Sequence, residues 1–229
     1  MTDKRPEIEA VAFDAYGTLL DVHSAVTRHA TRLGPDAAVF SQEWRVKQLE
    51  YSWVRSLTGP GHHQDFWTCT IEALHFVCSR FNVTDPVLVN DLLEAYRKLD
   101  AYAEVPGMLR ALRAGKMRTA MLSNGAPMML VDATTASGIS TLLDVLLSVE
   151  AVGIFKPDPR VYAMAVQRLG LPASRMAFVS ANPWDTQAAM HAGFRAIRVN
   201  RNGAPDEYGL EAAGVPSLTD LSTLPGLLA

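Results

Sequence analysis

Cysteine is scarce in this chain of 229 residues, which contains only Cys69 and Cys78. The two stand nine positions apart in a segment with a helical pattern, so we expect two buried thiols rather than a disulfide bridge. Unpaired thiols are typical of proteins that work in a reducing compartment, and we therefore expect a cytoplasmic protein.

Runs of basic residues and long apolar runs are absent as well. Lys and Arg are scattered, and the net charge of −3 gives no electrostatic reason to expect a nucleic-acid partner. The most apolar later stretch, residues 139–155, is interrupted by Asp144 and Glu150, so no membrane span is expected. The first nine residues are polar and lack the apolar core of a secretory signal.

Histidine spacing of the kind that binds zinc is also missing. His62 and His63 lie in a loop with Gly and Pro, where we expect both side chains to be exposed. Neither they nor His191 has ligand spacing to another His or Cys, so the sequence predicts no metal site of that kind.

The chain does have a large apolar fraction, 48%, which is enough for a sizeable core. Downstream of residue 105 it alternates between apolar strand patterns and helices with clear ends. The expected strands there are residues 117–122, 145–149, 176–179 and 196–199. One helix is expected from Asp158 as its cap, through Pro159, to Gly170 past its end. This alternation predicts an α/β fold with a Rossmann-like, doubly wound parallel sheet.

Residues 23–104 have a helical pattern throughout, with Val46, Leu49, Trp53 and Leu57 on one stripe that we expect to face inward. We interpret this segment as an all-α cap inserted after the first strand. The catalytic core would then comprise residues 1–22 and 105–229.

Polar side chains follow nearly every expected strand of the core. Asp14 ends the first strand, after the apolar residues 11–13. The others are Ser123, Asn124, Lys156, Ser180, Asn182 and Asp185. Each alone could be an ordinary strand end or helix cap. Because parallel strands present their carboxyl ends at one edge, we expect these side chains to converge on one crevice.

The string Phe13-Asp14-Ala15-Tyr16-Gly17-Thr18 resembles the nucleophile loop of the haloacid dehalogenase superfamily, and the whole chain resembles its L-2-haloacid dehalogenases, the type II dehalogenases. The further matching strings are residues 21–24, 44–45, 47–51, 122–125, 155–162 and 178–180, followed by Asn182 and residues 184–185. The resemblance implies hydrolysis of short (S)-2-haloalkanoic acids to (R)-2-hydroxy acids and halide, through an aspartyl ester, with inversion and without a cofactor.

The resemblance also implies roles for the residues that carry the reaction. Asp14 would be the nucleophile and Thr18 would orient it. Lys156 would keep the nucleophile ionised, because a nearby cation favours a charged carboxylate. Ser180, Asn182 and Asp185 would position the hydrolytic water, with Asp185 as the base.

Substrate contacts follow from the same resemblance. Arg45, Asn124 and Trp184 would hold the departing halide, since a fixed cation lowers the barrier to charge separation. Ser123 and neighbouring backbone N–H groups would hold the substrate carboxylate. The remaining pocket residues would be Ala15, Tyr16, Leu49, Phe66 and Tyr162. Taken without the resemblance, Arg45 would be a solvated surface charge, and the aromatic residues would be core.

Tyr16 separates two functions on this fold. In superfamily phosphatases an aspartate at this place protonates the leaving alcohol, and Mg²⁺ neutralises the phosphate. A halide needs no proton, and Lys156 can supply positive charge, so we expect a dehalogenase without metal. A Mg²⁺-dependent phosphatase and a non-catalytic binding protein stay open as alternatives.

Three departures from the family pattern touch the pocket or its rim. They are Val46 after Arg45 of the cap, Ala181 after Ser180, and a loop at residues 59–64 that is longer than usual. They leave the preferred substrate size undecided. Relatives are often homodimers, and the resemblance implies the same state here.

Overall fold

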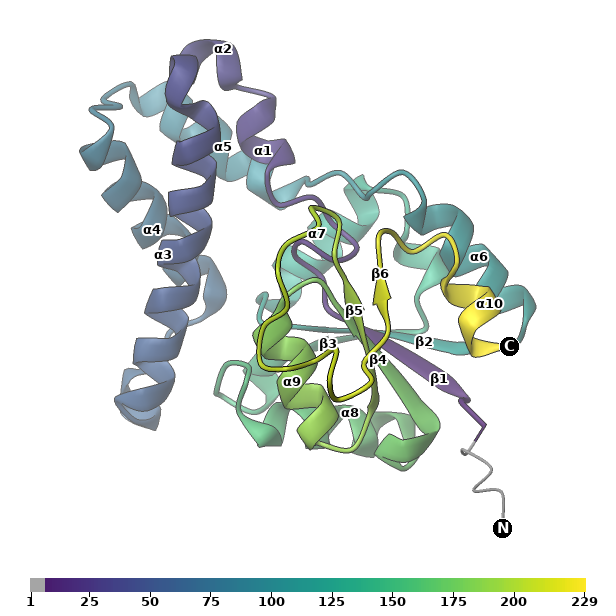
Figure 1. Cartoon of the computed structure of the whole chain (residues 1–229). Helices are drawn as coiled ribbons and strands as arrows, with labels where there is room; N and C mark the ends of the chain where they lie inside the picture. Colours follow the sequence, from purple (N-terminus) through teal and green to yellow (C-terminus); the bar gives the residue numbers. More distant parts are fainter. Residues whose placement is uncertain (1–6) are drawn as a thin grey trace.

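The computed structural model describes residues 7–229, so the expectation for the first nine residues falls mostly outside the described part. Its core is a six-stranded parallel sheet in the order β3-β2-β1-β4-β5-β6 (Figure 1). The strands are β1 (Ala10–Phe13), β2 (Arg118–Ser123), β3 (Val145–Ser148), β4 (Met176–Ser180), β5 (Arg195–Val199) and β6 (Ser217–Leu218). The predicted α/β fold is confirmed, and β6 is an edge strand that the sequence pattern did not indicate.

Helices flank this sheet in the rhythm expected from the sequence (Figure 1). They are α6 (Val105–Ala114), α7 (Pro127–Ala136), α8 (Pro159–Leu169), α9 (Pro183–His191) and α10 (Leu224–Leu228), with short 3-10 turns η3 (Ser140–Leu142), η4 (Val149–Ala151) and η5 (Ala173–Arg175). The predicted ends of α8 are confirmed. The side chain of Asp158 accepts from the Arg160 N–H, and Gly170 ends the helix at a φ of 63°. A left-handed end of this kind favours glycine.

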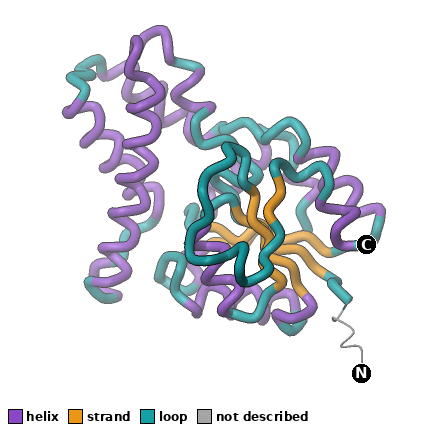
Figure 2. The backbone as a smooth tube through the Cα atoms, in the orientation of Figure 1, coloured by secondary structure: helices purple, strands orange, loops and turns teal. Residues whose placement is uncertain are grey.

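Residues 24–97, which lie between β1 and α6 in the chain, form a separate helical body beside the sheet, which we call the lid (Figure 2). It contains α1 (Ser24–Thr27), α2 (Ala30–Leu33), η1 (Gly34–Asp36), α3 (Ala37–Leu57), η2 (Pro60–His62), α4 (Phe66–Arg80) and α5 (Pro86–Arg97). Cys69 and Cys78 are buried, unpaired thiols in α4, as predicted. Over residues 7–229, the structure contains no helix with the length and apolarity to cross a membrane.

The predicted inner stripe of α3 is wrong in part. Val46 is 61% exposed and Leu57 is 87% exposed, whereas Leu49 and Trp53 are partly buried. The buried residues of α3 are Ala37, Phe40, Ser41, Trp44, Gln48 and Ser52. Half of this face is polar, so a search for apolar periodicity passes over it.

Polar groups on the buried face of α3 have partners within the lid. Gln48 donates to the Thr70 hydroxyl at 3.0 Å and accepts from the Tyr96 hydroxyl at 3.1 Å. The Trp44 indole N–H donates to the Thr70 carbonyl at 2.9 Å. Buried polar groups are tolerated when they are hydrogen-bonded, which explains why polar residues occupy the inner face.

Two chain crossings join the lid to the core. The Asp21 N–H donates to the Asp100 carbonyl at 2.8 Å, and the Tyr102 N–H donates to the Leu19 carbonyl at 3.1 Å. We call these antiparallel segments, residues 19–21 and 100–102, the hinge ladder. It begins five residues after Asp14.

The lid also contacts the core at a point away from the hinge ladder. His63 pairs with Glu150 at 2.9 Å, and the Phe155 N–H donates to the Ser56 hydroxyl at 3.2 Å. The expectation that His63 is exposed is therefore wrong, because its side chain is only 17% exposed in this contact. His62 is exposed, as expected.

Candidate active site

The carboxylate of Asp14 lies at the carboxyl end of the central strand β1 and is held by three side chains. Thr18 donates from its hydroxyl to Oδ2 at 3.0 Å, and Asn182 donates from its amide to the same oxygen at 2.8 Å. Lys156 Nζ lies 3.1 Å from Oδ1. Asp14 is 5% exposed, so this orientation is fixed in a nearly dry environment.

Lys156 bridges two buried carboxylates. Its ammonium lies 2.9 Å from Asp185 Oδ2 as well as close to Asp14, and its side chain is 1% exposed. Burial alone lowers the pKa of Lys156, but the charges of Asp14 and Asp185 outweigh that effect and raise it above its usual value. The lysine is therefore a permanent cation between the two acids.

Asp185 has two further donors. The Tyr162 hydroxyl donates to Oδ1 at 2.5 Å, and the Ser180 hydroxyl donates to Oδ2 at 3.0 Å. Burial raises the pKa of Asp185, with Lys156 acting in the opposite direction. Burial and the charge of Asp185 raise the pKa of the Tyr162 phenol, which therefore stays a neutral donor. Oδ1 keeps one acceptor direction beyond its bond to Tyr162.

The turn after β2 brings Ser123 and Asn124 to the same edge of the sheet. The Ser123 hydroxyl accepts from the Gly125 N–H at 3.0 Å. The side-chain oxygen of Asn124 accepts from the Lys156 N–H at 2.9 Å, which ties this turn to the loop that carries the lysine. Asn124 thus leaves its NH₂ end as the donor for a ligand.

Tyr16 forms a wall of the site. Its ring stacks on Tyr96 at 5.8 Å between centroids and lies 6.0 Å from Phe66, so both lid helices α4 and α5 contact it. A Cβ at Gly125 would lie 2.9 Å from this ring, so the close approach requires glycine there. Burial, followed by the charge of Tyr96, raises the pKa of Tyr16 well above its usual value. Its hydroxyl is buried and finds no hydrogen-bond partner among the described residues.

Arg45 of α3 reaches from the lid to the nucleophile loop. Its Nη2 donates to the Tyr16 carbonyl at 3.4 Å, and its Nη1 is buried without an acceptor in the described part of the chain. Arg45, Tyr16 and Asn182 line one cleft of about 520 Å³. A half-buried cation with a spare donor is suited to bind a small anion.

The predicted residues do not all gather in this cleft. Ala15 is buried in the nucleophile loop, and Phe66 lies between Tyr16 and Phe155. Leu49 is partly buried on α3. Trp184 packs edge to face on Trp53 of the lid at 5.5 Å and lines a separate hollow with His191 and Tyr208.

Several residues at the site were not predicted from the sequence. Tyr96 stacks on Tyr16, Phe155 packs on Phe66, and Tyr102 and Arg201 line the cleft. Arg201 follows β5, so the rule that ligands bind beyond the ends of parallel strands could have found it. Tyr96 lies in a helix without a motif, and no local signal indicates it.

The set of charged groups at the site is small. In the part of the chain that the structure describes, no three His, Cys, Asp or Glu side chains are grouped as metal ligands. Asp14 and Asp185 are instead bridged by Lys156, whose ammonium lies where a cation would neutralise them.

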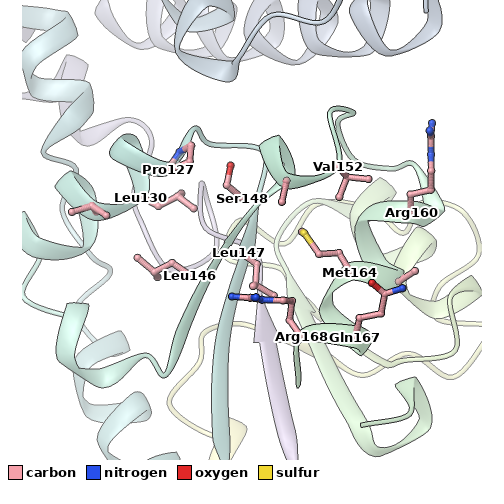
Figure 3. A pocket seen from close by; sticks show the side chains of 13 residues that line it. Pro127, Leu130, Leu146, Leu147, Ser148, Val152, Arg160, Met164, Gln167 and Arg168 are labelled. Carbon is pink, nitrogen blue, oxygen red and sulfur yellow. The ribbon is translucent and has the colours of Figure 1, made fainter. Parts of the chain in front are cut away.

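A larger cavity lies elsewhere. It is a groove of about 670 Å³ between α7, β3 and α8, with Leu130, Leu147 and Met164 on its apolar walls (Figure 3). Asp14 and Lys156 line neither this groove nor the cleft beside Arg45. Size alone is thus a poor guide to the reactive site in this protein.

Residues 8–193 match the family model of the haloacid dehalogenase-like hydrolases. The chain is 46% identical over 222 residues to (S)-2-haloacid dehalogenase 1 of Pseudomonas sp. (strain CBS-3), covering 96% of each chain. It is 44% identical over 202 residues to (S)-2-haloacid dehalogenase 4A of Burkholderia cepacia, covering 88% of this chain and 87% of the relative. Among solved structures it is similar to L-2-haloacid dehalogenase from Xanthobacter autotrophicus with chloropropionic acid covalently bound. That likeness has a TM-score of 0.83 and 33% identity, and covers 96% of this chain and 98% of the other.

Proposed function

The chain belongs to the haloacid dehalogenase-like hydrolase family, and we propose that it hydrolyses short (S)-2-haloalkanoic acids to (R)-2-hydroxy acids and halide. One observation carries the proposal. Asp14 is held by Thr18, Asn182 and the ammonium of Lys156, while Tyr16 stands where a phosphatase of this fold needs an acid.

In the first step a carboxylate oxygen of Asp14 attacks C2 of the substrate from the face opposite the halogen. The new C–O bond forms as the carbon–halogen bond breaks, so the configuration inverts and a halide ion leaves. The rigid hydrogen bonds to Oδ2 and the ammonium beside Oδ1 support this step, because they fix the carboxylate before the substrate arrives.

The departing halide needs positive charge. Arg45 Nη1 is buried and unpartnered in the described residues, and the NH₂ end of Asn124 is turned away from the bond that its oxygen makes. These two donors form the halide site that we propose. Trp184, which the resemblance adds as a third contact, packs on Trp53 and lines a separate hollow. Ser123, the backbone at Ala15 and Tyr16, and the pocket residues Leu49 and Phe66 would receive the rest of the substrate.

In the second step water attacks Cγ of the aspartyl ester. Asp185 takes the proton of that water on Oδ1, since Oδ2 already accepts from both Lys156 and Ser180. The tetrahedral intermediate then releases the 2-hydroxy acid as its alkoxide takes up this proton. The second proton of the attacking water is released to the solvent, so Asp14 returns as a carboxylate with one oxygen derived from water.

Halide release from the two enantiomers of 2-chloropropionate tests the proposal. We expect chloride and D-lactate from the L form and no chloride from the D form, with the activity unchanged by a metal chelator. Asp14→Asn should release no chloride. Absence of chloride from both enantiomers would refute the proposed reaction. Equal rates with the two enantiomers would refute the proposed stereochemistry. Chelator-sensitive release of phosphate from p-nitrophenyl phosphate would favour the phosphatase instead.

We assign residues 1–22 and 105–229 to the catalytic core and residues 23–104 to the cap. The position of the hinge ladder, residues 19–21 and 100–102, supports these boundaries. A cytoplasmic location is supported by the two unpaired, buried thiols. Recovery of the protein in the soluble cytoplasmic fraction of its natural host tests the location.

We also propose a homodimer formed through the outer face of α3. Four large apolar side chains are exposed there: Val39, Val46, Val54 and Leu57. Exposed apolar patches of this kind on a soluble protein mark interaction surfaces. Light scattering should give twice the chain mass for the wild type and the chain mass for Val46→Glu/Leu57→Glu. A monomeric wild type would refute the dimer.

A further inference from the structure

We propose that Arg201 is a positioning residue that braces the hinge of the lid and the nucleophile loop together. Arg201 lies in the loop after β5, beyond the motifs that carry the proposed reaction. The expected change in kcat rests on the proposed function. The brace itself rests only on the hydrogen bonds and the ion pair that Arg201 makes.

Arg201 contacts both chain crossings between core and lid. Its Nη2 donates to the Thr18 carbonyl at 3.0 Å, next to the first strand of the hinge ladder. Its Nη1 pairs with Glu104 at 2.6 Å, just beyond the second strand. The guanidinium also lies 3.7 Å from the ring centroid of Tyr102, a residue of the ladder itself. One side chain thus holds the core end of both strands.

Arg201 is mostly buried, so its ion pair and its hydrogen bond are shielded from water. Its side chain is 15% exposed and that of Glu104 is 19% exposed. Ion pairs at the surface contribute little, but charge-assisted bonds that are shielded from water are stronger. Arg is suited to this place because its planar group can donate in two directions and stack on a ring at once.

The loop that carries Arg201 is itself fixed. Asn200 donates from its side chain to the Ala204 carbonyl at 2.9 Å, and the Ala204 N–H donates back to the Asn200 side-chain oxygen at 2.9 Å. The Asn200 N–H donates to the Leu218 carbonyl of β6 at 2.7 Å. Figure 1 shows this loop between β5 and β6, within the core, so the brace is anchored on the sheet and not on the lid.

Thr18 transmits the brace to the reaction. Its carbonyl accepts from Arg201, while its hydroxyl donates to Oδ2 of Asp14 at 3.0 Å and accepts from the Ala181 N–H at 2.9 Å. When Arg201 holds the main chain at Thr18, the position of the Thr18 hydroxyl is fixed. The hydrogen bond from that hydroxyl then fixes the orientation of the Asp14 carboxylate. Loss of Arg201 would loosen the orientation of the carboxylate while leaving Asp14 and the three side chains that contact it unchanged.

The kinetic test is Arg201→Gln assayed for chloride release from L-2-chloropropionate. We expect kcat to fall about tenfold to a hundredfold, the loss that follows from one charge-assisted hydrogen bond, with KM changed by less than about threefold. Arg201→Lys should give an intermediate kcat, because an ammonium can bind either the Thr18 carbonyl or Glu104 but cannot bind both as the guanidinium does. The matched control is Arg195→Gln, which removes an arginine of β5 that donates to the distant Leu227 carbonyl.

A double-mutant cycle with Thr18→Val identifies the route. If Arg201 acts through the Thr18 hydroxyl, Arg201→Gln should cost less than about twofold in kcat once that hydroxyl is gone. An equal loss in both backgrounds would show that the effect reaches the site by another path. Glu104→Gln, which keeps the bond to Thr18, should cost less than Arg201→Gln.

Hydrogen exchange tests the brace without any substrate. In Arg201→Gln, the amides of residues 17–22 and 100–105 should exchange faster than in the wild type, while Arg195→Gln should leave them unchanged. Unchanged exchange in Arg201→Gln would refute the brace. If the wild type releases no halide, the proposed function fails and this measurement still decides the inference. Arg201→Lys provides the same comparison if the Gln variant does not fold.

Discussion

Replacement of Lys156 by Met removes the cation between Asp14 and Asp185 while keeping an unbranched side chain of similar length. The ammonium lies 3.1 and 2.9 Å from the two carboxylates, and its side chain is 1% exposed. At an effective dielectric constant of about 20, each contact is worth about 5 kcal/mol before the cost of dehydrating the charges is subtracted. Breaking a buried pair from one side costs about 3–5 kcal/mol, and we expect a loss of that size in the free energy of unfolding at pH 7.

The pH dependence of this loss has a definite sign. Burial already raises the pKa of Asp185, and loss of the lysine raises it further. A carboxyl with a raised pKa in the folded state binds more protons there than when unfolded, so it stabilises the fold at low pH and loses that contribution as pH rises. The deficit of Lys156→Met should therefore shrink as pH falls toward about 4, the usual pKa of the carboxyl.

The stability at alkaline pH should differ between the wild type and Lys156→Met. The pKa of Lys156 is raised in the fold, so its contribution is complete below the usual lysine pKa and is lost as pH rises through the folded value. The wild type should thus lose stability above about pH 10.5 by a route that the Met variant lacks.

Urea unfolding at pH 5, 7, 9 and 11, followed by tryptophan fluorescence, measures these effects. Lys98→Met is the control, because Lys98 is 63% exposed and lies 3.8 Å from Glu94, where a loss below about 0.5 kcal/mol is expected. Adding Asp185→Asn to Lys156→Met should restore part of the loss, since one uncompensated charge is removed. A loss under about 1 kcal/mol at pH 7, with no more pH dependence than the control, would refute this reasoning.

Two further predictions concern packing and thiols. Gly125→Ala should lower the free energy of unfolding by about 1–3 kcal/mol and raise KM, because the new Cβ would lie 2.9 Å from the Tyr16 ring. Gly107→Ala is the control, since no atom lies within 4 Å of its Cβ. Equal stability of the two variants would contradict the expectation. Burial raises the pKa of Cys69 and of Cys78 to about 11, so at pH 8 about one thiol in a thousand is ionised. Iodoacetamide should therefore label neither cysteine at pH 8 until urea unfolds the chain, and rapid labelling of the native protein would count against their burial.

The parts that sequence reasoning reached share a physical origin. Asp14, Lys156 and Asp185 each follow an apolar strand, and parallel strands must deliver their ends to one edge, so the network among them is predictable in outline. The pairing pattern within it is not, because which Asp14 oxygen faces Lys156 and which accepts from Asn182 depends on packing between segments more than a hundred positions apart.

The lid shows the opposite case. Its inner face was placed on the wrong side of α3 near Val46 and Leu57, since Gln48 and its partner Thr70 make a polar interior that apolar periodicity does not detect. His63 was expected in water because its loop is rich in Gly and Pro, yet Glu150 lies 87 positions later in the chain and pairs with it. Contacts of this kind have no local signature.

The bonds around Asp14 join segments that are far apart along the chain. Lys156 lies 142 positions from Asp14, and Asn182 lies 168 positions from it. Arg201 is 183 positions from its partner Thr18. Contacts between distant segments form late in folding, because long loops must close first. The reactive carboxylate therefore gains its counter-charge when the loop after β3 closes on β1. It gains its contact with Asn182, and Thr18 its contact with Arg201, only after β4 and β5 have joined the sheet. Halide release recovered during refolding would report the last ordering step, and it should lag behind the return of helical signal.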